Sequence, residues 1–125
     1  SKNKASHVVH LSDPVLDELN ALVGPAKHAL VFTTTGTTPV SDFTKAKAKL
    51  DQISGVSNWR LHDLRRSLAT VATEELGFEP VVVDRILNHV NGSVKGIAAV
   101  YQKGQYLEKR KTVLDVWAEY IQTPT

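Results

Sequence analysis

Residues 61–67, LHDLRRS, begin the most informative part of the chain. The chain also carries LNH at residues 87–89 and a tyrosine at position 101. Together these segments supply a guanidinium that forks around phosphate oxygens, two imidazoles that exchange protons near neutral pH, and a phenol able to form a phosphate ester. We therefore expect chemistry at a phosphodiester.

The composition is typical of one folded domain. The chain has 125 residues, of which 42% are hydrophobic and 22% charged, so a core can form. Fifteen Lys and Arg against thirteen Asp and Glu give a net charge of only +2, so an anionic partner has to be met by a local basic patch. The sequence contains no cysteine, which excludes disulfides, thiolate zinc sites and thiol nucleophiles.

The sequence also predicts where the protein works. No apolar run reaches membrane-spanning length and no signal peptide opens the chain. With the lack of cysteine, this predicts a cytoplasmic protein with no membrane contact. The chain begins with Ser1 rather than Met, and we expect a fragment of a longer protein.

Apolar spacing predicts a mainly α fold with a small β-sheet (α+β). Residues 7–11 and 29–34 are expected as short strands, because β-branched residues gather there beside polar or glycine-containing turns. Helical spacing predicts six helices, over residues 13–23, from a cap at Ser41 to Ile53, and over residues 61–76, 80–90, 94–101 and 107–121. In the last helix, Leu107, Leu114, Trp117 and Ile121 form the expected apolar stripe, with residues 108–111 in solvent.

His62 and Arg65 lie three residues apart at the start of the helix expected over residues 61–76. They share one face outside the apolar stripe of that helix. Backbone amides at a helix N-terminus favour an anion, and Asp63 suits the positive end of the helix dipole. A phosphate is therefore expected against this face.

Two other groups of residues have competing interpretations. Lys45, Lys47 and Lys49 form either a solvated helix face, which is the commoner arrangement, or contacts with DNA phosphates. His7 and His10 have a spacing that invites a zinc interpretation, but on a strand they point to opposite faces. No metal and no cofactor are expected.

In order and spacing, these motifs resemble the C-terminal catalytic domain of tyrosine recombinases, the phage-integrase family. Residues 62–65 match its H-x-x-R box, residues 87–89 its L-x-H box, and Tyr101 its nucleophile. Lys2, followed by residues 7–12, is similar to the hairpin whose lysine is the general acid, with Lys4 as a substitute. The tail after Tyr101 is similar to integrases of prophages and genomic islands.

The resemblance implies a role for each group. Arg65 clamps the phosphate, and Tyr101 attacks it to form a 3′-phosphotyrosine. His62 accepts the proton of the phenol, His89 donates a hydrogen bond to a nonbridging oxygen, and Lys2 protonates the departing 5′-oxygen.

The resemblance also implies partners and missing parts. The full-length protein is expected to act as a homotetramer on double-stranded DNA at attachment sites. Another clamp arginine and the N-terminal DNA-clasping domain of the family have no counterpart in these residues, so this fragment alone is expected to be inactive. The last helix has two interpretations, because its apolar face docks on a neighbouring protomer or folds back on its own core.

Other interpretations stay open from sequence alone. His62 and His89 have structural alternatives, the second as a helix cap, and Tyr101 has one as a core residue. One alternative is a helix-turn-helix that binds DNA without catalysing a reaction. It would consist of residues 68–76 and 80–87, joined by a turn at Gly77. A type IB topoisomerase-like enzyme shares the same tyrosine chemistry.

Overall fold

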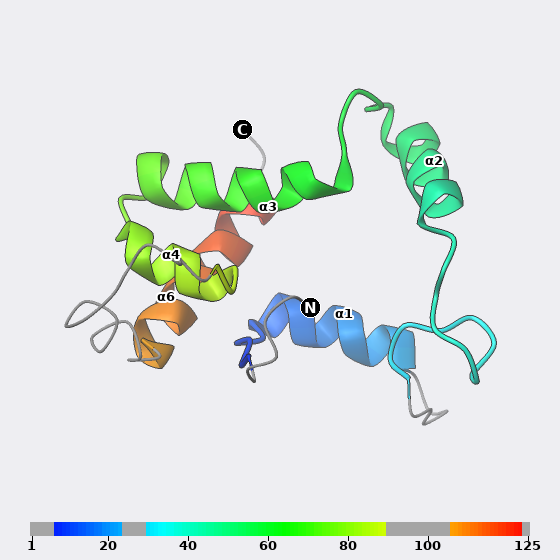
Figure 1. The fold of residues 1–125 in the computed structure, drawn as a ribbon, viewed down its shortest axis with the longest axis horizontal. Helices are drawn as coiled ribbons and strands as arrows, with labels where there is room; N and C mark the ends of the chain where they lie inside the picture. The colour runs from blue at the N-terminus through cyan, green and yellow to red at the C-terminus, as the bar shows by residue number, and fades with distance from the viewer. Residues whose placement is uncertain (1–6, 24–29, 90–105, 124–125) are drawn as a thin grey trace. The chain divides into compact units, whose positions relative to one another are not determined.

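The computed structural model describes residues 7–23, 30–89 and 106–123, and the regular secondary structure in these ranges is helical (Figure 1). The helices follow the expected order closely. Their bounds are α1 Asp13–Val23, α2 Phe43–Ser54, α3 Leu61–Thr70, the π-helical turn η1 Val71–Glu75, α4 Pro80–Ile86 and α6 Leu107–Gln122. The helix expected over residues 94–101 lies outside the described residues.

The expected β-sheet is wrong for the described residues, which contain no strand. The Val8 carbonyl accepts a hydrogen bond from the Arg110 side chain rather than from a neighbouring strand. In residues 30–38 the backbone bonds locally instead: the Gly36 amide donates to the Thr33 hydroxyl, and the Thr38 amide to the Thr35 hydroxyl. Threonine hydroxyls thus offer the backbone an alternative to a sheet ladder.

The chain divides into two compact units. One comprises Ser1–Asp13 with Arg65–Thr125, and the other comprises Pro14–Leu64. We call them the α4–α6 unit and the α2 unit, and each is described by itself.

The α4–α6 unit is built around helix α4. Val82 and Val83 of α4 are 2% and 1% exposed, and Val113 of α6 is 1% exposed. Helix α4 contacts both α6 and η1. The buried core consists of Leu68, Ala72, Val82, Val83, Ile86, Leu87 and Val113. Because α4 buries three of its seven residues, the short helix is held by packing rather than by its own propensity.

The start of α3 shows why this helix begins where the sequence predicted. The backbone amide of Arg60 donates to Asp63 Oδ2 at 2.9 Å, and the Asp63 amide donates to the Arg60 carbonyl at 2.9 Å. This is the backward half of a capping box, and it also places a carboxylate at the positive end of the helix dipole. The predicted role of Asp63 is confirmed.

The α2 unit corrects two sequence interpretations. Asp42, not Ser41, caps α2, because its side chain accepts from the Lys45 amide. Lys47 is not a solvated lysine, since its Nζ lies 2.7 Å from Asp51 Oδ2, 3.0 Å from the Ser57 carbonyl and 4.8 Å from the Trp59 ring centroid. A side chain held by three partners is poorly suited to reach a DNA phosphate.

Helix α6 corrects a third interpretation. Arg110, expected in solvent, is only 3% exposed, whereas Leu107 and Ile121 of the expected stripe are 49% and 60% exposed. Burial, and next the nearby charge of Arg85, lowers the pKa of the Arg110 guanidinium. The apolar face of α6 that is formed by Val113 packs back on α4.

The N-terminal segment, residues 7–12, is tied to α4 and α6 by polar contacts. His7 Nε2 donates to the Ile86 carbonyl at 3.0 Å, and Arg110 donates to the Val8 carbonyl. His10 Nε2 lies 2.8 Å from Asp115 Oδ1. Each histidine therefore bonds to a different helix, which is incompatible with one shared metal ion.

In the described part of the chain, no helix combines the length and apolar character needed to cross a membrane.

Arg110→Ala is expected to lower the free energy of unfolding by about 2–4 kcal/mol, because it removes a buried side chain and leaves the Val8 carbonyl without its donor. The matched control is Lys111→Ala, whose side chain is exposed and pairs with Asp115 one turn along the helix at 3.3 Å. That control should cost less than about 0.5 kcal/mol. Urea unfolding measures both, and equal losses would contradict the structural role of Arg110.

The contact between His10 and Asp115 should make stability depend on acid pH. The hydrogen bond from His10 lowers the pKa of the Asp115 carboxyl below its ordinary value of 3.8. Stability from this carboxylate is therefore fully present above pH 3.8 and is lost as the pH falls through the lowered pKa. The difference in unfolding free energy between the native chain and Asp115→Asn should shrink over that range. A difference that stays constant as the pH falls well below 3.8 contradicts this linkage.

Candidate functional site

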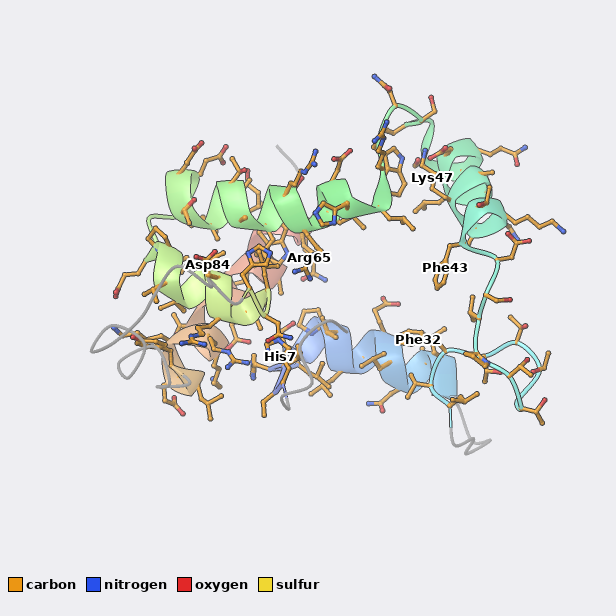
Figure 2. All side chains as sticks on the ribbon, in the orientation of Figure 1. His7, Phe32, Phe43, Lys47, Arg65 and Asp84 are labelled. Atoms are coloured by element: carbon orange, nitrogen blue, oxygen red, sulfur yellow. The ribbon has the colours of Figure 1, made fainter. Side chains whose placement is uncertain are left out.

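Arg65 points from α3 to the end of α4 within the α4–α6 unit (Figure 2). Its Nη2 donates to the Leu87 carbonyl at 2.6 Å. The residue as a whole is exposed, and a guanidinium carries five N–H donors in a planar fork. One bond to a carbonyl therefore fixes the side chain while leaving the fork able to bind a phosphate.

Helix α4 ends within residues 84–89, where one residue adopts the left-handed backbone conformation. Asn88 has a φ of +58°, its amide donates to the Arg85 carbonyl at 3.2 Å, and the His89 amide donates to the Asp84 carbonyl at 2.9 Å. These two bonds are the 5→2 and 6→1 pair of a Schellman motif. We refer to residues 84–89 as the α4 terminus.

His89 is exposed at this terminus. Its Nδ1 lies 3.5 Å from Asp84 Oδ1, with the two side chains 53% and 58% exposed. A carboxylate beside Nδ1 favours an N–H on that nitrogen, which leaves Nε2 to face a substrate. The helix cap that the sequence suggested for His89 is made by its backbone amide rather than by its ring.

Two neighbouring carbonyls of the α4 terminus receive side chains from separate parts of the chain. The Ile86 carbonyl accepts from His7 and the Leu87 carbonyl accepts from Arg65. Carbonyls in the last turn of a helix have no partner within the helix, and the negative end of the dipole favours cationic donors. The α4 terminus thus joins the N-terminal segment to α3.

The carbonyl that binds the Arg65 side chain belongs to Leu87, the second residue before His89 in the chain. His62 is exposed in the first turn of α3, one helical turn before Arg65. Lys2 and Tyr101 lie outside the described residues, so their predicted roles stay predictions.

Sequence reasoning missed two backbone features of this site. The first is the Leu87 carbonyl, which no side-chain motif reveals. The second is the left-handed conformation of Asn88, where the sequence placed the end of α4 later, at residues 91–92. Asparagine is enriched at positive φ and at the C′ position of helices, so Asn88 was a usable signal for the helix end.

Tyr120 is bound in a way that does not suit a nucleophile. Its hydroxyl donates to Glu75 Oε2 at 2.8 Å, and its ring stacks on Trp117 with centroids 5.7 Å apart. The hydrogen bond to Glu75 raises the pKa of the phenol. A structural role for Tyr120 follows.

A pocket of about 190 Å³ lies between α4 and α6, away from the candidate residues. It is lined by Phe78, Glu79, Val82, Lys109, Thr112 and Val113. Lys109 and Glu79 form an ion pair of 3.1 Å in this lining. None of the candidate residues Arg65, His62 and His89 borders it.

Comparisons with known proteins agree on one kind of relative. No family model matches the chain, and no solved structure matches it. The integrase of Shigella phage Sf6 is 29% identical over 124 residues, which cover 96% of this chain and 31% of the relative.

Two proteins of Escherichia coli K12 match equally well. Prophage integrases IntA and IntS are each 29% identical over 124 residues, covering 96% of this chain and 29% and 31% of their own lengths. The chain therefore spans about 30% of the length of these curated relatives. It is similar to phage and prophage integrases over nearly all of its own length, which confirms the resemblance that its motifs indicated.

Proposed function

We propose that the full-length protein is a site-specific recombinase that cuts and rejoins duplex DNA through a tyrosine nucleophile. The observation that supports this most directly is the placement of Arg65 on the Leu87 carbonyl, two residues before His89. A guanidinium and an imidazole held at one helix terminus are suited to gripping one phosphate. The integrase names of the three relatives support the same class of reaction.

Arg65 is the phosphate clamp in this proposal. As the phosphodiester is attacked, negative charge gathers on its two nonbridging oxygens, and a planar fork binds both in fixed geometry. Because Arg65 is already held on the Leu87 carbonyl, little ordering of the side chain is needed when DNA binds. His89 donates a further hydrogen bond to one of these oxygens, and its Nδ1 lies 3.5 Å from Asp84 Oδ1.

The reaction runs in two balanced steps. The Tyr101 oxygen bonds to phosphorus while the bond from phosphorus to the 5′-oxygen breaks. The phenolic proton passes to His62, and the 5′-oxygen takes a proton from Lys2, with Lys4 as the substitute. The 3′-phosphotyrosine keeps the energy of the broken bond, so the 5′-hydroxyl of a partner strand reverses the step and joins the new strand. The duplex partner is an attachment site, held by four protomers.

The structure argues against the helix-turn-helix alternative. In such a motif the second helix presents base-reading side chains to the major groove. Here the second helix is α4, whose Val82, Val83 and Ile86 are buried in the core. The integrase names of the three relatives favour strand exchange over a topoisomerase, which rejoins the strand it has cut.

The nucleophile is tested with nicked suicide DNA, which traps a covalent adduct. Full-length protein should form an adduct that Tyr101→Phe abolishes. Tyr120→Phe is the matched control, because it removes a hydroxyl that is bound to Glu75, and it should keep the adduct. Denaturing gel electrophoresis measures both, and an adduct that persists in Tyr101→Phe refutes the assignment.

The clamp is tested by Arg65→Lys, which keeps the charge but removes the fork. We expect the single-turnover rate of adduct formation to fall about 100-fold, as for the loss of one transition-state donor. Arg66→Lys, next along α3 and outside the proposed clamp, should change the rate by less than about threefold. Equal rates for the two variants contradict the role given to Arg65.

A further inference from the structure

One residue of the α4 terminus has an unusual backbone conformation. Asn88 has a φ of +58°, in the left-handed region that few residues other than glycine adopt easily. It lies between Leu87, whose carbonyl binds Arg65, and His89, which lies beside Asp84. The backbone torsions of this single residue therefore lie between the carbonyl that anchors Arg65 and the residue that carries the imidazole.

The φ angle of Asn88 determines how the Leu87 carbonyl and His89 are directed relative to each other. The residue before it, Leu87, has a φ of −79° and a ψ of 0°, which continues the helical turn. If Asn88 moved to negative φ, either the Leu87 carbonyl would turn away from Arg65 or the chain would carry His89 off in another direction. The hydrogen bond from the His89 amide to the Asp84 carbonyl, 2.9 Å long, could not survive unchanged.

We infer that Asn88 is a positioning residue, whose left-handed conformation holds the Arg65 guanidinium and the His89 imidazole together before DNA binds. This inference rests on the proposed function for its catalytic consequence, but the positioning itself is a property of the DNA-free protein. Asn88 touches no substrate in this scheme. It acts through the Leu87 carbonyl and through the direction that it gives to the chain at His89.

The α4–α6 unit offers a matched control at Gly77. This residue also has positive φ, +74°, in the turn before α4, and a Cβ added there meets nothing within 4 Å. Gly77→Val therefore places the same β-branched side chain at a positive φ, at the other end of the same helix. β-branched residues are disfavoured most at positive φ, so Asn88→Val and Gly77→Val should both lower the melting temperature. Glycine adopts positive φ readily, so Asn88→Gly should keep the native backbone conformation.

The first measurement is the rate of adduct formation on nicked suicide DNA at saturating full-length protein. We expect a loss of at least about 30-fold in Asn88→Val, since a small misplacement of reacting groups costs up to about 100-fold. Gly77→Val should stay within about threefold of the native rate, and Asn88→Gly should recover to the same range. DNA affinity, measured in a Tyr101→Phe background, should change less than the rate. A similar loss in both valine variants, or failure of glycine to recover, overturns the inference.

The second measurement needs no activity. Full-length protein labelled with ¹⁵N at arginine gives side-chain signals, and that of Arg65 is identified by its loss in Arg65→Lys. The bond to the Leu87 carbonyl should slow rotation of the guanidinium in the native protein, Asn88→Gly and Gly77→Val, and not in Asn88→Val. Slow rotation that persists in Asn88→Val overturns the positioning role. If native protein forms no adduct, the proposed function fails, while this signal still decides the inference.

Discussion

The hydrogen bond from Arg65 to the Leu87 carbonyl is the contact on which the candidate site depends. It joins α3 to the α4 terminus at a point where a helix has unpaired carbonyls and a partial negative charge. The neighbouring Ile86 carbonyl receives His7 in the same way. The N-terminal segment and α3, which are distant in sequence, thus meet at the end of one helix. The side chains that bind there are a histidine and an arginine.

This arrangement is supported by the packing of α4 in the core. Its valines are buried between η1 and α6, so the terminus that carries Leu87 and Asn88 is fixed by the core rather than by its own short run of hydrogen bonds. The buried guanidinium of Arg110 adds a polar tie from α6 to the N-terminal segment. Rigid support of this kind is what a phosphate clamp requires, since its geometry has to be set before the substrate arrives.

The sequence predicted the helices well because their spacing and their caps are local properties. Residues 13–23 and the last helix were placed correctly within a residue, and Asp63 was recognised as an N-terminal carboxylate. The strands were wrong because a strand depends on partners that a local pattern does not reveal. The burial of Arg110 was missed for a related reason: a charged residue is ordinarily exposed, and only its tertiary bond to the Val8 carbonyl explains the exception.

For the candidate site, the sequence identified side-chain chemistry but not the backbone that arranges it. Arg65 and His89 were chosen from motif order, and the structure brings them to one helix terminus. The Leu87 carbonyl has no sequence signature at all, whereas Asn88 at the end of an apolar helix has one, because asparagine tolerates positive φ. Motifs therefore indicated candidate groups, and the backbone conformation of Asn88 between Leu87 and His89 is what the structure adds.

The aromatic contacts have a practical consequence for spectroscopy. The chain contains two tryptophans, and each lies in a different unit. Trp59 of the α2 unit has the Lys47 ammonium over its ring, while Trp117 of the α4–α6 unit stacks on Tyr120. Their indoles sit in chemically distinct surroundings, so replacing either one by phenylalanine leaves a single tryptophan whose emission reports the surroundings within its own unit.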